Sequence, residues 1–364
     1  MEDNKGSSSS LSAPEAGLDH GYVPDCSVMP PTSRPGPIMD VMDVPVIDIA
    51  CLRESPDGRA RVVEGIGKAC RQLGFFQVAN HGISESVMEG ALSAASDFFA
   101  LPHKEKMELM SNDVTKPVRY CTSLRDGIDQ RQFWRVFLKH YAYPLDTWIK
   151  LWPCSPPDYR QKLVFFCISE KMATYSAQVR ILALEVLGAI MESLKLGHTY
   201  MSERLEEGMQ VMAIHCYPPC PHPDLVLGLP QHSDYACITI LLQSRQGLQV
   251  MDPDQGGTWK VVPVHPGYLH VHLGDHLEVL TNGGYKSAVH RAILNSEQMR
   301  YSIASIHGLA MDDKMETADE LVMGDQRTRV YKASSFRDFL NFISETDISK
   351  GGSFLDSLKV ELDA

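Results

Sequence analysis

Short apolar runs with a two-residue period fill the C-terminal half of the chain. Between residues 208 and 310, Pro, Gly, Asp and Asn separate seven such runs: MQVMAIHCY, CITILLQ, LQVM, TWKVVPV, YLHVHLG, SAVHRAIL and RYSIASIHG. Several short strands with turn residues between them are typical of an antiparallel sandwich or barrel. The pattern therefore predicts a mainly β fold with a jelly-roll core.

Apolar residues at helical spacing mark the segments before and after this core. They predict helices at 60–74, 84–101, 157–197 and 333–345, and short β-type runs predict strands at 44–49 and 75–80. Gly74 stands where a helix would stop, and Ser84 is a candidate N-cap. Pro157 and Gly197 could begin and end the longest helical pattern. We therefore expect flanking helices around the core.

Composition divides the chain further. Residues 1–43 are rich in Ser, Pro, Gly and Asp and have too little apolar surface to offset the entropy of ordering, which predicts a disordered tail. We expect residues 44–200 to form a helical and strand region that packs on the core. Residues 201–345 should hold the jelly-roll core and the helix that follows it, and residues 346–364 a C-terminal tail.

Charge and cysteine usage exclude several classes of protein. The 364 residues carry a formal charge of -12, which makes nucleic acid or an anionic membrane a poor partner. The nine cysteines are odd in number, irregularly spaced and without a CxxC pair, which favours reduced thiols. No signal peptide is visible, and no apolar run approaches the roughly 20 residues that span a bilayer. We expect a cytoplasmic monomer that acts on a small molecule.

Polar side chains at the predicted strand ends are candidates for chemistry. His232 and Asp234 stand two apart, so on a strand they share a face and either satisfy a hydrogen bond or hold a metal. His290 adds a second imidazole from another predicted strand. Two histidines and one carboxylate with open positions are what non-haem Fe(II) oxygenases use.

A second polar pair stands on the predicted strand RYSIASI. Arg300 offers a planar fork for a carboxylate, and Ser302 adds a hydroxyl on the same face. An arginine on such an apolar strand is costly to bury without an anionic partner, which a dicarboxylate co-substrate would supply. Tyr217, at the end of the first core strand, would add a phenolic hydroxyl.

The segments that carry these residues resemble the plant Fe(II)/2-oxoglutarate-dependent dioxygenases, most closely the flavanone 3-dioxygenase-like and gibberellin-modifying members. The resemblance spans about residues 44–340, through GFFQVANHG (74–82), YPPCPHPDLVLGLPQHSD (217–234), LGDHLEVLTNGGYKSAVHRAILN (273–295) and RYSIASI (300–306). It implies a double-stranded β-helix core. It also implies His232, Asp234 and His290 as iron ligands, and Arg300, Ser302 and Tyr217 as the 2-oxoglutarate site.

The same resemblance implies substrate contacts and includes two departures from the family pattern. The substrate-contacting positions of relatives match six residues here: Tyr120, Phe133, Trp134, Ala213, Ile306 and His307. His215 stands where the family usually has Asn, and we expect it near the co-substrate with a different hydrogen bond. His272 stands where the family often has Asn, and it is a rival nitrogen ligand whose spacing does not match the motif.

The reaction that the resemblance implies needs Fe(II), 2-oxoglutarate and O₂. It releases succinate and CO₂ and adds a hydroxyl to a small apolar plant metabolite, such as a flavonoid, a gibberellin-type diterpenoid or a phenolic. Desaturation or demethylation could replace hydroxylation within the same family. A metal-dependent hydrolase and a non-catalytic barrel that binds a small molecule also remain open, although the hydrolase leaves the pair Arg300 and Ser302 unexplained and the binding protein does not need a metal triad.

Overall fold

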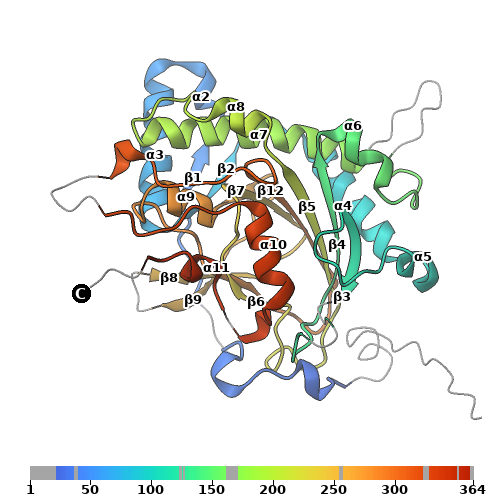
Figure 1. Cartoon of the computed structure of the whole chain (residues 1–364). Helices are drawn as coiled ribbons and strands as arrows, with labels where there is room; N and C mark the ends of the chain where they lie inside the picture. Colours follow the sequence, from blue (N-terminus) through green and yellow to red (C-terminus); the bar gives the residue numbers. More distant parts are fainter. Residues whose placement is uncertain are drawn as a thin grey trace, which may run out of the picture.

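Two β-sheets form the core of the chain (Figure 1). The computed structural model describes residues 22–36, 40–122, 125, 128–160, 171–253, 257–322, 328–350 and 352–360. The larger sheet runs in the order β1 (Val46–Asp48), β2 (Phe75–Ala79), β10 (Leu269–Leu273), β7 (Ile238–Gln243), β12 (Arg300–His307), β5 (Gln210–Tyr217), β4 (Val136–Tyr143) and β3 (Val118–Thr122). The smaller sheet runs in the order β6 (Leu229–His232), β11 (His290–Ala292), β8 (Leu248–Asp252) and β9 (Thr258–Val261).

The seven runs predicted as core strands each contain a strand, which are β5 and β7 to β12. The prediction of a mainly β, jelly-roll fold with flanking helices is therefore confirmed. Three further strands, β3, β4 and β6, were not predicted. Strands β3 and β4 extend one edge of the larger sheet beyond β5, and all these pairs are antiparallel.

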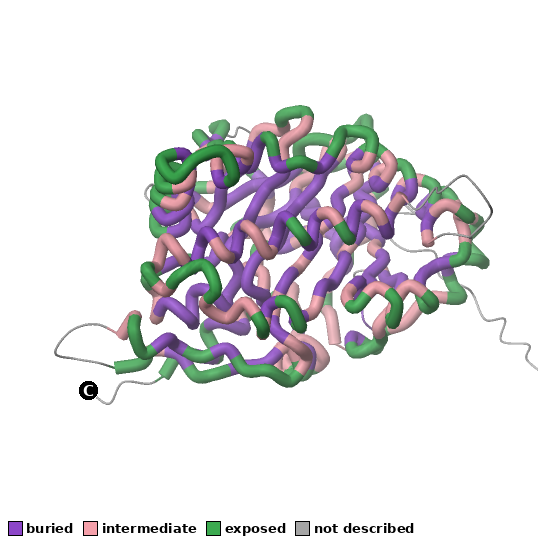
Figure 2. Tube along the Cα trace, turned by 90° about the horizontal axis from the view of Figure 1, so that it is seen from above, coloured by how far each residue is buried: buried purple, intermediate pink, exposed green. Residues whose placement is uncertain are grey.

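Helices flank the two sheets. They are α2 (Cys51–Glu54), α3 (Pro56–Gln72), α4 (Glu85–Phe99), α5 (His103–Met107), α6 (Leu145–Trp148), α7 (Lys171–Ser193), α8 (Ser202–Glu206), α9 (Asp275–Leu280), α10 (Phe336–Glu345) and α11 (Phe354–Ser357). Helices α4 and α7 contact β12, and α3 contacts β2. Figure 1 shows α7 crossing above the strands and α10 lying in front of them. Figure 2 shows the resulting burial: buried stretches run through the middle and exposed stretches gather at the rim.

Local sequence explains where α3 begins and ends. The Ser55 side-chain oxygen accepts a hydrogen bond from the Gly58 N–H at 3.0 Å, which caps the first turn. Ile66 on its apolar face is fully buried. Gly74 follows the helix with a φ of 65°, and a Cβ there would lie 2.0 Å from the Lys286 carbonyl oxygen. Only glycine fits this stop, as the pattern predicted.

The longest predicted helix is shorter than expected. Helix α7 ends four residues before Gly197, and residues 157–160 form turns, so a helix does not begin at Pro157. Residues 161–170 lie outside the described residues. Within the described part of the chain, no helix is both long and apolar enough to cross a bilayer.

Parts of the two predicted tails pack against the core. The Met29 N–H donates to the Leu225 carbonyl oxygen at 2.9 Å, and the Met29 side chain is buried, so residues 22–36 are ordered on the surface of the core. At the other end, Phe354 and Leu355 of α11 are buried. Residues 1–21 and 361–364 lie outside the described residues. The expected division into regions stays a prediction.

Candidate active site

A cavity of about 1110 Å³ lies between the two sheets. Strands β4, β5, β7 and β12 line it on the side of the larger sheet, and β6, β8 and β11 line it on the other. Helix α10 adds Phe336, Phe339 and Leu340 to its wall. Ligand pockets commonly measure about 300–1,000 Å³, so this space can hold a co-substrate together with a small metabolite.

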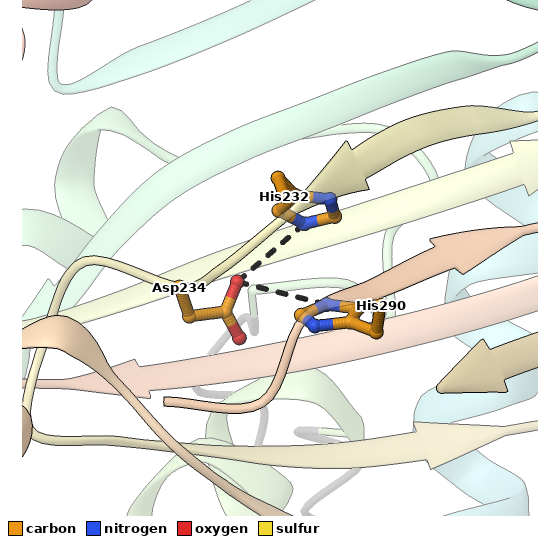
Figure 3. Close-up of side chains that lie close together, drawn as sticks. All are labelled: His232, Asp234 and His290. Carbon is orange, nitrogen blue, oxygen red and sulfur yellow. Dashed lines mark ion pairs between the residues drawn. The ribbon is translucent and has the colours of Figure 1, made fainter. Parts of the chain in front are cut away.

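Strand pairing brings the two predicted histidines together. His232 ends β6 and His290 begins β11, and the two residues lie directly opposite each other in the smaller sheet. Asp234 follows two residues after His232, and Figure 3 shows the three side chains pointing toward one another. Asp234 Oδ1 lies 3.6 Å from His232 Nε2 and 3.9 Å from His290 Nε2.

Backbone carbonyls orient both imidazoles. His232 Nδ1 donates to the Pro230 carbonyl oxygen, and His290 Nδ1 donates to the Ala288 carbonyl oxygen, each at 2.9 Å. A carbonyl oxygen can only accept, so Nδ1 carries the proton in each ring and Nε2 keeps its lone pair. The two lone pairs therefore belong to the nitrogens nearest Asp234.

The electrostatics keep these groups in the form that binds a cation. Burial, together with the neighbouring His290, lowers the pKa of His232 to about 4, so this ring is neutral at neutral pH. Burial alone would raise the pKa of Asp234, but His290 and His232 hold it below its ordinary value. The cluster therefore offers a neutral His232 imidazole beside the Asp234 carboxylate.

This donor set fits a ferrous ion. One atom from each of the three residues lies within 4.8 Å of the others. Two atoms bound to one ion at about 2.1 Å are at most about 4.2 Å apart, and both measured distances to Asp234 Oδ1 meet that limit. Two histidines and one carboxylate, with the remaining positions open, suit non-haem Fe(II).

His272, the rival ligand considered above, lies beside this group but is not part of it. Its ring meets the His290 ring edge-on with centroids 4.6 Å apart. Both ring nitrogens are buried and have no hydrogen-bond partner among the described residues. Burial and the neighbouring His290 hold the pKa of His272 well below its ordinary value, so the ring is neutral.

Arg300 lies in the same cavity with donors to spare. Its Nε donates to the Arg245 carbonyl oxygen at 3.0 Å, and its Nη2 donates to Gln243 Oε1 at 2.7 Å. Its Nη1 is buried and has no hydrogen-bond partner among the described residues. Gly247 leaves room for this side chain, because a Cβ there would lie 2.7 Å from Arg300 Cδ. A fixed, buried guanidinium of this kind fits a carboxylate.

Ser302 and Tyr217 lie next to Arg300 on the inner face of the sheet. Tyr217 pairs with Arg300, and His215 pairs with Ser302 across β5 and β12. The Arg300 guanidinium carbon lies 4.8 Å from the centre of the Tyr217 ring. Arg135 donates to His215 Nδ1 at 2.8 Å. Burial, with Arg135 and Arg300, holds the pKa of His215 well below its ordinary value, so this departure from the family pattern places a neutral acceptor opposite Ser302.

The six expected substrate positions fall into two groups. Ala213 and Ile306 line the cavity, because both point to the inner face of their strands. Four others do not line it: Tyr120, Phe133, Trp134 and His307. For Phe133 and Trp134 the reason is that both are buried in small apolar clusters just before β4.

Strand alternation explains the other two misplaced positions. Tyr120 faces the helices, with its ring 6.2 Å from that of Phe98. His307 also points away from the cavity, and its Nε2 shares a hydrogen bond with Ser305 Oγ at 2.9 Å. Residues next to each of them, Arg119 and Ile306, line the cavity instead. Tyr120 and His307 therefore lie outside the cavity wall, and their substrate contacts stay a prediction.

Sequence reasoning missed a basic wall at the β3–β4 end of the cavity. Arg119, Arg135 and Lys139 line it there. The signal was present in the run RVFLK (135–139), where arginine, phenylalanine and lysine alternate with valine and leucine. This two-residue period is typical of a strand with one polar face.

Comparisons with known proteins agree with the geometry. Residues 44–155 match the family described as non-haem dioxygenase in morphine synthesis N-terminal, and residues 208–308 match the 2OG-Fe(II) oxygenase superfamily. Flavanone 3-dioxygenase 3 of Oryza sativa subsp. japonica is 48% identical over 318 residues, which cover 87% of this chain and 93% of the relative.

Two further similarities extend over most of the chain. The 2-oxoglutarate-dependent dioxygenase 21, chloroplastic, of Oryza sativa subsp. japonica is 45% identical over 334 residues, covering 92% of this chain and 93% of the relative. The crystal structure of JOX2 in complex with 2OG, Fe and JA superimposes with a TM-score of 0.79 at 27% identity, covering 96% of this chain and all of that chain.

Proposed function

The chain belongs to the 2OG-Fe(II) oxygenase superfamily and is a 2-oxoglutarate-dependent dioxygenase of plant metabolites, and on this premise we propose how its residues divide the work. His232 Nε2, His290 Nε2 and Asp234 Oδ1 hold Fe(II). Arg300 and Ser302 hold the far carboxylate of 2-oxoglutarate, with Tyr217 beside them. The observation that supports this division is the meeting of three donor atoms within 4.8 Å in the cavity that also contains the buried Arg300 Nη1.

Bound Fe(II) and 2-oxoglutarate supply the oxidising chemistry with O₂, releasing succinate and CO₂ as the substrate gains a hydroxyl. The protein contributes position and a shielded site. The Pro230 and Ala288 carbonyls hold the imidazoles, and Gln243 holds Arg300. The aromatic side chains of α10 add an apolar part to the cavity wall. No side chain is needed as a general base.

The substrate is a small, largely apolar plant metabolite: a flavonoid, a gibberellin-type diterpenoid or a phenolic. The name of the relative that is 48% identical supports the first of these. The acidic charge of -12 supports an enzyme that works without nucleic acid or a membrane. We expect it to act as a monomer in the cytoplasm.

The test is an untargeted screen. Purified protein with Fe(II) and 2-oxoglutarate is incubated in air with plant metabolite extracts, while succinate is quantified and mass spectrometry detects products. We expect succinate together with a metabolite that gains one oxygen atom only when 2-oxoglutarate is present. Loss of two hydrogens or of a methylene unit would instead indicate desaturation or demethylation. Absence of succinate with every extract would contradict the proposal.

A further inference from the structure

One row of side chains crosses the inner face of the larger sheet from the middle of the cavity to its wall. The register places Ala304 beside Ala213, Ala213 beside Lys139, and Lys139 beside Arg119 on β12, β5, β4 and β3. All four side chains line the cavity. The two alanines leave the middle of the row open, and two cations stand at its end.

More positive charge surrounds the end of this row. The guanidinium carbons of Arg119 and Arg135 lie 5.1 and 4.8 Å from the centre of the Phe137 ring, so one aromatic side chain contacts both cations. Arg125 also lines the cavity, but it pairs with Asp129 at 2.7 Å. Asp129 therefore neutralises Arg125, while Arg119, Arg135 and Lys139 add further positive charge to the wall.

Arg119 is a buried cation with little to bind. It is 7% exposed, its Nη1 reaches only the Ser111 carbonyl oxygen at 3.4 Å, and its Nε has no hydrogen-bond partner among the described residues. Lys139 donates to the Val114 and Lys116 carbonyl oxygens at 3.1 and 2.7 Å. No carboxylate in the described ranges forms an ion pair with either cation.

Burial, which the charge of the nearby Asp113 carboxylate offsets only in part, is unfavourable for both groups. It is the main reason why the pKa of Lys139 falls to about 7 and why the pKa of Arg119 lies below its ordinary value. An anion bound between them would offset the lost hydration. A carboxylate is the best match, because the planar fork of an arginine donates hydrogen bonds to both of its oxygens side by side.

We propose that the substrate is an organic acid whose carboxylate binds Arg119 and Lys139 while its apolar body lies over Ala213 and Ala304. This inference rests on the proposed function and narrows its substrate class to acids. A neutral flavanone has no carboxylate and would leave the basic wall without a partner. The substrate therefore differs in charge from the one named for the relative that is 48% identical.

The dimensions of the sheet agree with this placement. Neighbouring strands lie about 4.8 Å apart, so β3 lies roughly 14 Å from β12 across the sheet. Arg300 on β12 serves the co-substrate at one end, and Arg119 on β3 binds the acid group at the other. Ala304 on β12 and Lys139 on β4 are two strand spacings apart, so roughly 10 Å of the sheet is available to the apolar body, the scale of one or two rings with a short side chain.

The test compares acids with their own esters on the full chain. The probes are cinnamate and a panel of plant aromatic and terpenoid acids, the methyl ester of each acid, and a neutral flavanone. Binding is measured anaerobically by thermal shift with Fe(II) and 2-oxoglutarate present, and oxygen gain is measured after air is admitted. We expect acids to bind and to be oxidised with a kcat/KM at least about tenfold above that of their esters.

Two variants connect this preference to the basic wall. Arg119→Gln should raise the Kd and KM for the acid at least about tenfold while leaving the affinity for 2-oxoglutarate unchanged. Arg61→Gln, which removes an exposed guanidinium from α3, is the matched control and should change neither. Ala213→Leu fills the middle of the row and should weaken binding of the acid without removing a charge. It therefore tests the proposed site even if Arg119→Gln fails to fold.

The outcomes separate this inference from the function on which it rests. Oxidation of esters or of the flavanone as efficient as that of acids would overturn the inference and leave the oxygenase function intact. The inference would also be overturned if Arg119→Gln and Ala213→Leu both left the Kd for the acid unchanged. Acid binding that depends on Arg119 without any succinate would support the acid site and contradict the oxygenase function.

Discussion

The two ends of the cavity are built differently. At the β6–β11–β12 end, backbone carbonyls hold both imidazoles and Gln243 holds Arg300, so the polar groups are fixed before any ligand arrives. At the β3–β4 end, Arg119 and Lys139 contact backbone carbonyls, and no described carboxylate forms an ion pair with them. One end is preorganised for chemistry that a whole superfamily shares, and the other end carries the basic wall that we propose as the binding site for the substrate carboxylate.

This contrast teaches where substrate specificity can be altered independently of the reaction. A change at the first end should affect every substrate alike, because iron and 2-oxoglutarate take part in each turnover. A change at the second end should affect acids selectively. Substitutions at each end can therefore test whether the two functions are separable.

The largest expected effect is the loss of the metal. Asp234→Ala removes the one anionic donor of the cluster, so we expect iron binding and all turnover to disappear. Metal analysis after anaerobic loading with Fe(II) measures the iron content per chain. Asp224→Ala, at an exposed carboxylate nearby in sequence, is the control and should load normally. One tightly bound iron per chain in Asp234→Ala would remove this residue from the ligand set.

The next effect should be confined to the co-substrate. Arg300→Ala removes a charge-assisted pair worth about 1.5–3 kcal/mol, so the KM for 2-oxoglutarate should rise about tenfold to a hundredfold. Iron content and the Kd of an acid probe should stay close to those of the wild type. Titration of succinate formation against 2-oxoglutarate gives the KM. An unchanged value would contradict the role of Arg300.

A smaller effect should come from the residue that positions Arg300. Gln243→Leu removes the acceptor that lies 2.7 Å from Arg300 Nη2 but keeps the positive charge. We expect the KM for 2-oxoglutarate to rise by less than in Arg300→Ala, roughly tenfold or under, since one neutral acceptor is worth about 0.5–1.5 kcal/mol. A rise equal to that of Arg300→Ala would mean that the guanidinium depends entirely on Gln243 for its position.

The smallest effect concerns the pH dependence of stability at the basic wall. The folded pKa of Lys139, about 7, lies below the value near 10.4 of an unfolded chain. Between these values the unfolded chain binds a proton that the folded chain does not, so the unfolding free energy of the wild type rises with pH. Lys139→Met should lack this rise, which is at most about 1.4 kcal/mol per pH unit. Urea denaturation of both proteins from pH 7 to 10 measures the difference, and equal slopes would contradict it.

The elements that could be predicted are those whose sequence signal lies within one short segment of the chain. The core strands have a two-residue period between turn residues, and α3 has both a cap and a glycine stop, so these elements were predicted. Strands β3 and β4 lie between helices in the sequence and pair with each other, and β4 also pairs with β5 far along the chain. Their apolar alternation alone does not identify that partner. The start of the longest helix was wrong because turn residues after Pro157 precede it.

The candidate site divides in the same way. His232, Asp234 and His290 were singled out by residue type and spacing, and the pairing of β6 with β11 brings them together. Their roles, and that of Arg300, remain proposals to be tested. Tyr120 was misplaced because the face that a strand residue occupies depends on the register with its neighbours. That register was not predictable from one strand alone.

The carbonyls that orient His232 and His290 belong to residues two positions upstream in each case. Every amino acid supplies the same main-chain oxygen, so mutations that arise at those two positions leave the acceptor in place. A duplicated gene could thus accumulate changes along β3 and β4 while inheriting a working iron centre. Diversification of substrate without reinvention of the oxidant is the evolutionary consequence of holding a ligand by the main chain.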